Sequence, residues 1–141
     1  MRRPSDALVI DAAVLIALVL GRQRRVLEGV AAKRKLVTTE RAVAESARRL
    51  ELGMERPDLL PVLALTVADV DVIPPEKIHA LESEAARALV NAPASRNGSA
   101  RDAHVLACAW AVEGDIWTFD RDFAETGVAS WSTANLLKAL A

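Results

Sequence analysis

The sequence lacks most of the residues and motifs that define the common functional classes. Its 141 residues contain one cysteine, Cys108, and no tyrosine, and aromatic residues make up 4% of the chain. One cysteine excludes an internal disulfide framework and a cysteine-based zinc cluster, and so few aromatics leave little surface on which single-stranded bases could stack. There is no glycine-rich phosphate loop and no Gly-x-Ser-x-Gly elbow, and His79 and His104 lack metal-ligand spacing.

Long hydrophobic runs are also missing. The longest uninterrupted one covers residues 12–20, well short of the roughly 20 residues that span a bilayer. Arg2 and Arg3 imitate the start of a secretory signal, but Asp11 interrupts the apolar stretch and no small-x-small cleavage site follows Gly21. The sequence therefore predicts a cytoplasmic protein without a membrane segment.

The chain nevertheless has ample material for a hydrophobic core. Hydrophobic residues make up 52% of it and charged residues 26%, a balance that excludes intrinsic disorder and low-complexity classes. A length of 141 residues suits one core, so we expect a single domain over residues 1–141.

Charge is distributed unevenly although the net charge is −1. Residues 1–56 carry 12 basic and 7 acidic side chains, whereas residues 57–141 carry 6 and 12. Part of the basic excess lies in Arg22, Arg24 and Arg25. An ordinary solvated helix face explains such a run, but a basic flank beside an acidic site would also suit a phosphate backbone.

Hydrophobic periodicity predicts strands that alternate with helices. Expected strands lie at residues 7–10, 67–73, 115–119 and 128–131, and expected helices at 12–20, 24–32, 40–52, 57–65, 75–90, 102–113 and 133–140. Thr38 or Thr39 is expected to cap the third helix. Strands separated by helices favour parallel crossovers, and the prediction is a three-layer α/β/α sandwich around a mainly parallel sheet.

Five acidic residues stand where such a fold could bring them together: Asp11, Glu45, Asp102, Asp120 and Asp122. Each has a structural explanation of its own, since Asp11 can cap a helix, Asp102 can close a capping box with Ser99, and the others can be solvated or form turns. Ligand sites in α/β sheets, however, gather at the carboxyl ends of the strands, where Asp11 and Asp120 are expected.

Carboxylates that converge in this way need a cation. Two of them about 4 Å apart repel by about 4 kcal/mol at an effective dielectric near 20. A cluster of oxygens without histidine or cysteine suits Mg²⁺ or Mn²⁺. A metal held there would activate water for hydrolysis of a phosphodiester.

The sequence also resembles the PIN-domain ribonucleases, especially the small VapC-like toxins of bacterial toxin-antitoxin modules. The resemblance covers nearly the whole chain and rests on VIDAAVLI at residues 9–16, TERAVAE at 39–45, RDAHVLA at 101–107 and WTFDRDF at 117–123. The last two segments are the most specific.

The resemblance implies roles for individual residues. Asp11, Glu45, Asp102 and Asp120 match the metal-binding acids of the family, Asp122 matches a further ligand or supporting acid, and Thr118 matches a polar residue at the end of the last strand. Ala13 stands where family members often have serine or threonine, and the Thr38-Thr39 region replaces a common proline. Family members are commonly homodimers silenced by an antitoxin protein, so both partners are expected here.

The leading hypothesis is a Mg²⁺- or Mn²⁺-dependent endoribonuclease whose Arg22, Arg24, Arg25 or Arg121 meets the RNA backbone. An aspartyl-phosphate phosphoryl-transfer enzyme is a weaker alternative, because no Asp-x-Asp begins at Asp11 and no lysine follows a late strand. A PIN-like scaffold that binds a partner without cutting is the non-enzymatic alternative.

Overall fold

A parallel sheet of five strands forms the centre of the protein. The computed structural model describes residues 3–22, 24–90, 102–119 and 126–141. Its strands are β1 (Ala7–Ile10), β2 (Lys35–Thr39), β3 (Asp71–Ile73), β4 (Asp115–Trp117) and β5 (Ser130–Trp131). They pair in the order β3-β2-β1-β4-β5, and every pair is parallel.

The strand order reverses at β1. The chain builds β2 and β3 on one side of β1, then returns to place β4 and β5 on the other. Val9 of β1 pairs with Val37 of β2, and Ile10 pairs with Trp117 of β4. The carboxyl ends of β1, β2 and β4 therefore meet at the same edge, where α/β sheets bind their ligands.

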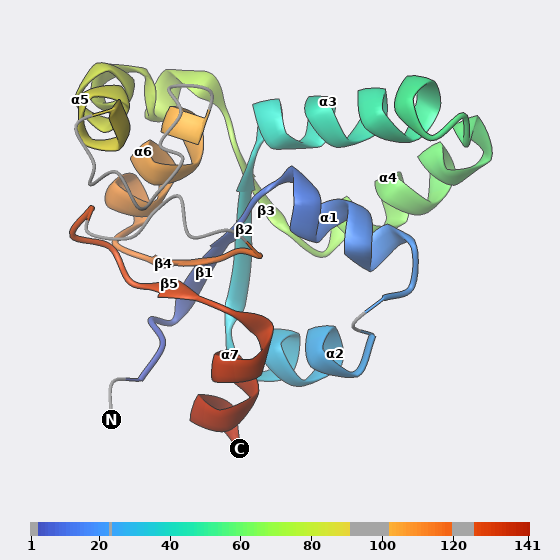
Figure 1. The fold of residues 1–141 in the computed structure, drawn as a ribbon, viewed down its shortest axis with the longest axis horizontal. Helices are drawn as coiled ribbons and strands as arrows, with labels where there is room; N and C mark the ends of the chain where they lie inside the picture. Colours follow the sequence, from blue (N-terminus) through green and yellow to red (C-terminus); the bar gives the residue numbers. More distant parts are fainter. Residues whose placement is uncertain (1–2, 23, 91–101, 120–125) are drawn as a thin grey trace.

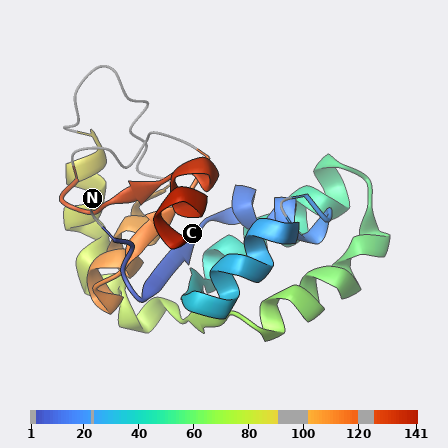
Figure 2. The same ribbon diagram turned by 90° about the horizontal axis from the view of Figure 1, so that it is seen from below.

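Helices cover both faces of this sheet (Figures 1 and 2). They are α1 (Ala12–Val19), α2 (Arg24–Lys33), α3 (Glu40–Arg48), α4 (Leu60–Ala68), α5 (His79–Val90), α6 (Ala103–Val112) and α7 (Thr133–Leu140), with short turns at Arg49–Gly53, Pro57–Leu59 and Pro75–Lys77. Helices α5 and α6 lie on one face, and α1, α2 and α7 on the other (Figure 1). The predicted three-layer α/β/α sandwich is confirmed, and no helix in the described part of the chain is long and apolar enough to cross a membrane.

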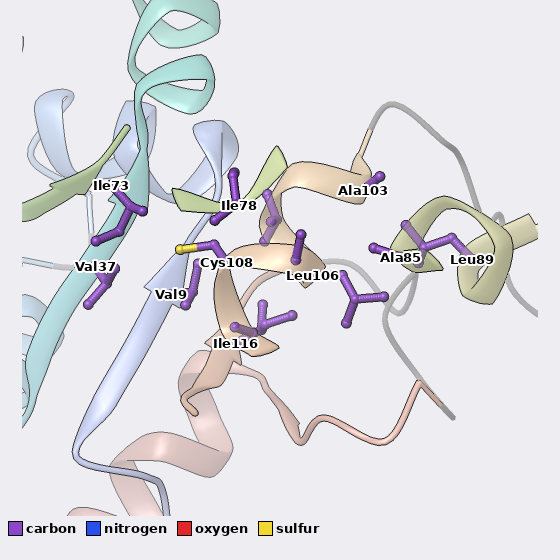
Figure 3. Packing of buried hydrophobic residues seen from close by; sticks show 13 residues of the cluster. Val9, Val37, Ile73, Ile78, Ala85, Leu89, Ala103, Leu106, Cys108 and Ile116 are labelled. Carbon is purple, nitrogen blue, oxygen red and sulfur yellow. The ribbon is translucent and has the colours of Figure 1, made fainter. Parts of the chain in front are cut away.

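Side chains of β1 alternate between two cores. Val9 points into the core beneath α5 and α6, where Figure 3 shows it near Cys108 and Ile116. Leu8 and Ile10 belong to the opposite core, with Leu15 of α1 and Trp117 of β4. All of these side chains are fully buried, which explains why this strand is a continuous apolar run.

The pattern-based prediction is wrong about one central strand. Residues 35–39 were expected to lead into a helix cap, but they form β2, between β1 and β3. Only Leu36 and Val37 are apolar there, so the segment lacks the usual signature of a buried strand. Thr39 does cap α3, because its side chain accepts a hydrogen bond from the Ala42 amide at 3.0 Å.

Some boundaries also differ from prediction. Helix α4 continues to Ala68, so Val67 lies in a helix and β3 begins only at Asp71. Strand β4 ends at Trp117 instead of residue 119, and β5 begins at Ser130 instead of residue 128. The apolar stretch at 67–73 mixes the end of one buried helix with the start of a strand, which period alone does not separate.

Candidate metal centre

Asp11 lies at the end of β1 and is held by two hydrogen bonds. Its Oδ1 accepts from the Val14 amide at 3.0 Å and thereby caps α1. Its Oδ2 accepts from the Thr118 hydroxyl at 2.7 Å. Thr118 is buried and follows β4 directly, so the pairing of β1 with β4 sets the orientation of this carboxylate.

Glu45 reaches the same region from α3. This helix begins at the Thr39 cap and packs along α1 (Figure 1). The Ser46 hydroxyl donates to the Ala42 carbonyl at 2.8 Å and lies 3.5 Å from the Ala12 carbonyl at the start of α1. The partly buried Glu45 carboxylate stands 4.0 Å from the Arg49 guanidinium.

Asp102 approaches from the other face of the sheet, at the start of α6. It occupies the cap position, but its side chain makes no capping hydrogen bond to that helix. The proposed capping box with Ser99 includes a residue outside the described part of the chain. Asp102 instead lines a pocket shared with the other two acids.

The acidic pocket, as we name it, has a volume of about 70 Å³. Its lining residues are Asp11, Ala12, Ala13, Glu45, Arg49, Asp102, His104 and Val105. Three carboxylates predicted from distant parts of the chain thus face one small polar space. Their oxygens, without any thiol, form the donor set that Mg²⁺ and Mn²⁺ prefer.

The described acids do not by themselves form a closed ligand cluster. Within residues 3–22, 24–90, 102–119 and 126–141, no three Asp, Glu, His or Cys side chains are grouped closely enough to hold an ion. Asp120 and Asp122, the other predicted acids, lie outside the described residues.

Buried polar side chains connect the elements that carry the acids, and sequence reasoning missed most of them. Thr38 donates to the Ile10 carbonyl at 2.7 Å, joining the ends of β2 and β1. The hydroxyl of Thr39 lies 2.7 Å from Nδ1 of His104, joining the cap of α3 to the first turn of α6. Buried polar groups require such partners, so these residues hold the carriers of Asp11, Glu45 and Asp102 in place.

His104 is neutral in this setting. Burial lowers its pKa to about 4, and the nearby positive charge of Arg41 acts in the same direction. The imidazole therefore serves as an uncharged hydrogen-bond partner of Thr39 at the wall of the acidic pocket. The expectation that this histidine is structural or solvated is met in its structural form.

The predicted RNA-binding arginines lie elsewhere or are not described. Arg22 and Arg25 are exposed beyond the far end of α1, about 12 Å of helix away from Asp11. The Arg24 side chain and all of Arg121 lie outside what the structure describes. Arg49 and, next to Glu45, Arg41 and Arg48 stand closer to the acids; their spacing from Glu45 on one helix was a signal that could have identified them.

Cys108 has no part in this site. It is fully buried between the sheet and α5 (Figure 3), and burial, with a smaller contribution from Asp71, raises the pKa of its thiol to about 12. A protonated buried thiol is a poor nucleophile, in agreement with the prediction from sequence.

Comparison with known proteins gives both a family and a fold. The family model described as "PIN domain" matches residues 9–141. The solved structure of VapBC2 from Rickettsia felis, bound to a DNA fragment from their promoter, is similar with a TM-score of 0.66 at 10% identity, covering 89% of this chain and 98% of that one. PAE2754 from Pyrobaculum aerophilum gives a TM-score of 0.65 at 21% identity, covering 95% of this chain and 94% of that one.

At these identities the structural matches establish a shared fold. The comparison with curated proteins gives no match. The family assignment rests on the model that covers all but the first eight residues, and it agrees with the parallel sheet and with the acids at its carboxyl edge. The chain therefore belongs to the PIN domain family.

Proposed function

We propose that this protein is a metal-dependent endoribonuclease that hydrolyses RNA phosphodiester bonds and acts as the toxin of a toxin-antitoxin pair. The observation that carries the proposal is the acidic pocket, where Asp11, Glu45 and Asp102 meet beside the reversal of strand order. PIN domains are generally nucleases, which supports the same reaction class.

Asp11, Glu45 and Asp102 would hold Mg²⁺ or Mn²⁺, with Asp120 completing the set and Asp122 as a further ligand or supporting acid. The metal would supply an activated water and stabilise the negative charge that develops on the phosphate and the leaving oxygen.

The protein's own side chains prepare this site. Thr118 and the Val14 amide each engage one oxygen of Asp11, so the carboxylate does not have to be reoriented when a ligand arrives. Arg49 offsets part of the repulsion among the acids through its position beside Glu45. Thr39, His104 and Ser46 keep α3 and α6 at the distance from α1 that the shared pocket requires.

A set of substitutions tests the catalytic proposal. Asp11→Asn, Glu45→Gln, Asp102→Asn and Asp120→Asn should each remove most cleavage of single-stranded RNA in Mg²⁺ or Mn²⁺. Loss of a group that only orients a metal ligand costs roughly 10–100-fold, so loss of a ligand should cost more. Thr118→Val should fall in that 10–100-fold range, since it removes the hydroxyl that orients Asp11.

Two controls make the result specific. Glu51→Gln removes an exposed carboxylate from the turn after α3 and should leave cleavage unchanged. Asparagine is as good a helix cap as aspartate, so Asp11→Asn should fold, and in metal-free buffer its melting temperature should equal or exceed that of the parent. Mn²⁺ should raise the melting temperature of the parent more than that of Asp11→Asn. Normal cleavage by all the acid variants would refute the nuclease.

The partner proposals need separate measurements. The similar fold of a protein solved as VapBC2 with promoter DNA supports an antitoxin partner, and the family resemblance supports a homodimer. A small protein encoded beside this one, which binds this chain and inhibits cleavage, is expected. Light scattering over a wide concentration range should give twice the mass of one chain; the mass of one chain throughout would contradict the dimer.

A partner-binding scaffold without catalysis makes different forecasts. It would neither cleave RNA nor gain thermal stability from Mn²⁺. The same titration of the purified protein therefore separates the scaffold from the nuclease.

A further inference from the structure

Beside the acidic pocket, α3 presents a second, larger pocket lined by basic side chains. Arg41, Ala44, Glu45 and Arg48 enclose about 390 Å³. Glu45 also lines the acidic pocket, so the two spaces adjoin at this residue. The methyl side chain of Ala44 leaves room between the two arginines.

Helix geometry places the two guanidinium groups on one face. Arg41 and Arg48 are seven positions apart, which is close to two turns and about 10.5 Å along the axis. Glu45 lies between them in sequence and is turned slightly to the side of the acidic pocket. The face therefore carries a positive charge on each side of the glutamate.

These two arginines differ from their neighbours in having no protein partner. Arg49 lies 4.0 Å from Glu45, and Arg56 is paired with Asp58 at 2.9 Å. Arg41 and Arg48 are exposed and, among the described residues, form neither an ion pair nor a hydrogen bond. Their donors are available for a ligand.

The charge of Arg41 acts at the acidic pocket itself. It contributes to the lowered pKa of His104, which lines that pocket. By contrast, Arg22 and Arg25 follow the far end of α1 and do not contribute to the described lining of either pocket. Position therefore favours the α3 pair over the cluster suggested by charge density in the sequence.

We propose that Arg41 and Arg48 bind backbone phosphates of the RNA on one side of the scissile bond and hold the strand against the acidic pocket. This inference rests on the proposed ribonuclease function. Guanidinium groups match phosphate oxygens through paired hydrogen bonds. Two of them beside the pocket also offset the repulsion between three carboxylates and an approaching polyanion.

The test measures RNA binding as a function of salt. Arg41→Ala/Arg48→Ala is compared with Arg22→Ala/Arg25→Ala, which removes the same charge, and each pair is placed in the Asp11→Asn chain so that RNA stays intact. The probe is a fluorescent single-stranded RNA of mixed sequence, titrated in divalent-free KCl buffers. All four arginines are exposed, so unchanged melting temperatures verify folding.

Each lost phosphate contact lowers the log-log salt slope by about 0.7 for single strands, so the α3 pair should lower it by about 1.4. The ratio of parent to variant affinity should then rise about 25-fold between about 1 M and about 0.1 M salt. The Arg22/Arg25 variant should keep the parental slope. In the chain with Asp11 intact, the α3 double variant should raise KM with little change in kcat.

The outcomes separate the two proposals. A parental slope for the α3 pair, or an equal loss in both pairs, overturns the assignment of Arg41 and Arg48 even when the parent cleaves RNA. If the parent binds RNA but does not cleave it, the nuclease proposal fails while the slopes still decide the arginines. Binding in the control pair's absence but not in the α3 pair's absence supports the inference, and a parent that does not bind RNA overturns it. If the α3 pair instead receives an acidic protein segment, RNA slopes stay parental and the inference falls.

Discussion

The buried hydroxyl of Thr39 links two helices that carry candidate metal ligands, and its removal has a calculable cost. It accepts a hydrogen bond from the Ala42 amide at 3.0 Å and lies 2.7 Å from Nδ1 of His104. Thr39→Val keeps the branched shape within β2 but removes both interactions. The change therefore uncaps α3 and leaves a buried ring nitrogen without its partner.

The two losses can be added as an order-of-magnitude estimate. Loss of a helix cap costs about 0.5–2 kcal/mol, and a buried group left unsatisfied costs about 1–3 kcal/mol. We expect the free energy of unfolding to fall by about 2–4 kcal/mol. With an unfolding entropy of about 2.1 cal/mol/K per residue, this corresponds to a drop in melting temperature of about 7–13 °C for a chain of this length.

Urea and thermal denaturation, both followed by circular dichroism, measure the effect. Thr39→Ser keeps the hydroxyl and should lose about 1 kcal/mol, the value of one buried methyl group. Thr66→Val removes a hydroxyl that donates to the Val62 carbonyl on the exposed side of α4, and should change stability by no more than about 0.5 kcal/mol. If Thr39→Val is no more destabilising than Thr66→Val, the linking role of this hydrogen-bond network is refuted.

Two further predictions follow from burial and close packing. Because burial raises the pKa of Cys108 to about 12, its thiol should stay protonated at pH 8, and iodoacetamide should label it only in denaturant; rapid labelling of the folded protein would contradict its placement. Gly114→Ala should destabilise the protein by about 1–3 kcal/mol, because the new Cβ would lie 2.8 Å from the Ala7 carbonyl oxygen. Gly29→Ala meets no atom within 4 Å and should stabilise α2 by up to about 1 kcal/mol; equal melting temperatures for the two glycine variants would show that the close approach at Gly114 is absent.

Several parts of the fold were predictable because local chemistry and tertiary environment agree. The apolar run of β1 ends at an aspartate that caps the next helix. The predicted terminal helix at 133–140 coincides with α7, which Ser132 caps. At these places one strand or helix signal dominates, and the turn residues mark its limits.

Strand β2 was not predictable in the same way. Its threonines suit a helix cap as well as a strand, and the residues around Leu36 and Val37 are polar or charged. Burial of Thr38 and Thr39 becomes favourable only after β1 and α6 provide their hydrogen-bond partners, the Ile10 carbonyl and His104. Those partners are distant in sequence, so no local pattern contains the information.

The candidate site divides along the same line. Residue type and position after strands or at helix starts were enough to select Asp11, Glu45 and Asp102, because hard cations require carboxylate oxygens and α/β sheets collect ligands at one edge. Which basic residues stand beside them was decided by tertiary structure. The packing of α3 against α1 puts Arg41 and Arg48 next to the acids, whereas the direction of α1 carries Arg22 and Arg25 away. Charge density along the chain is a local quantity, but proximity to a site depends on helix packing and strand order, which arise from contacts between distant segments.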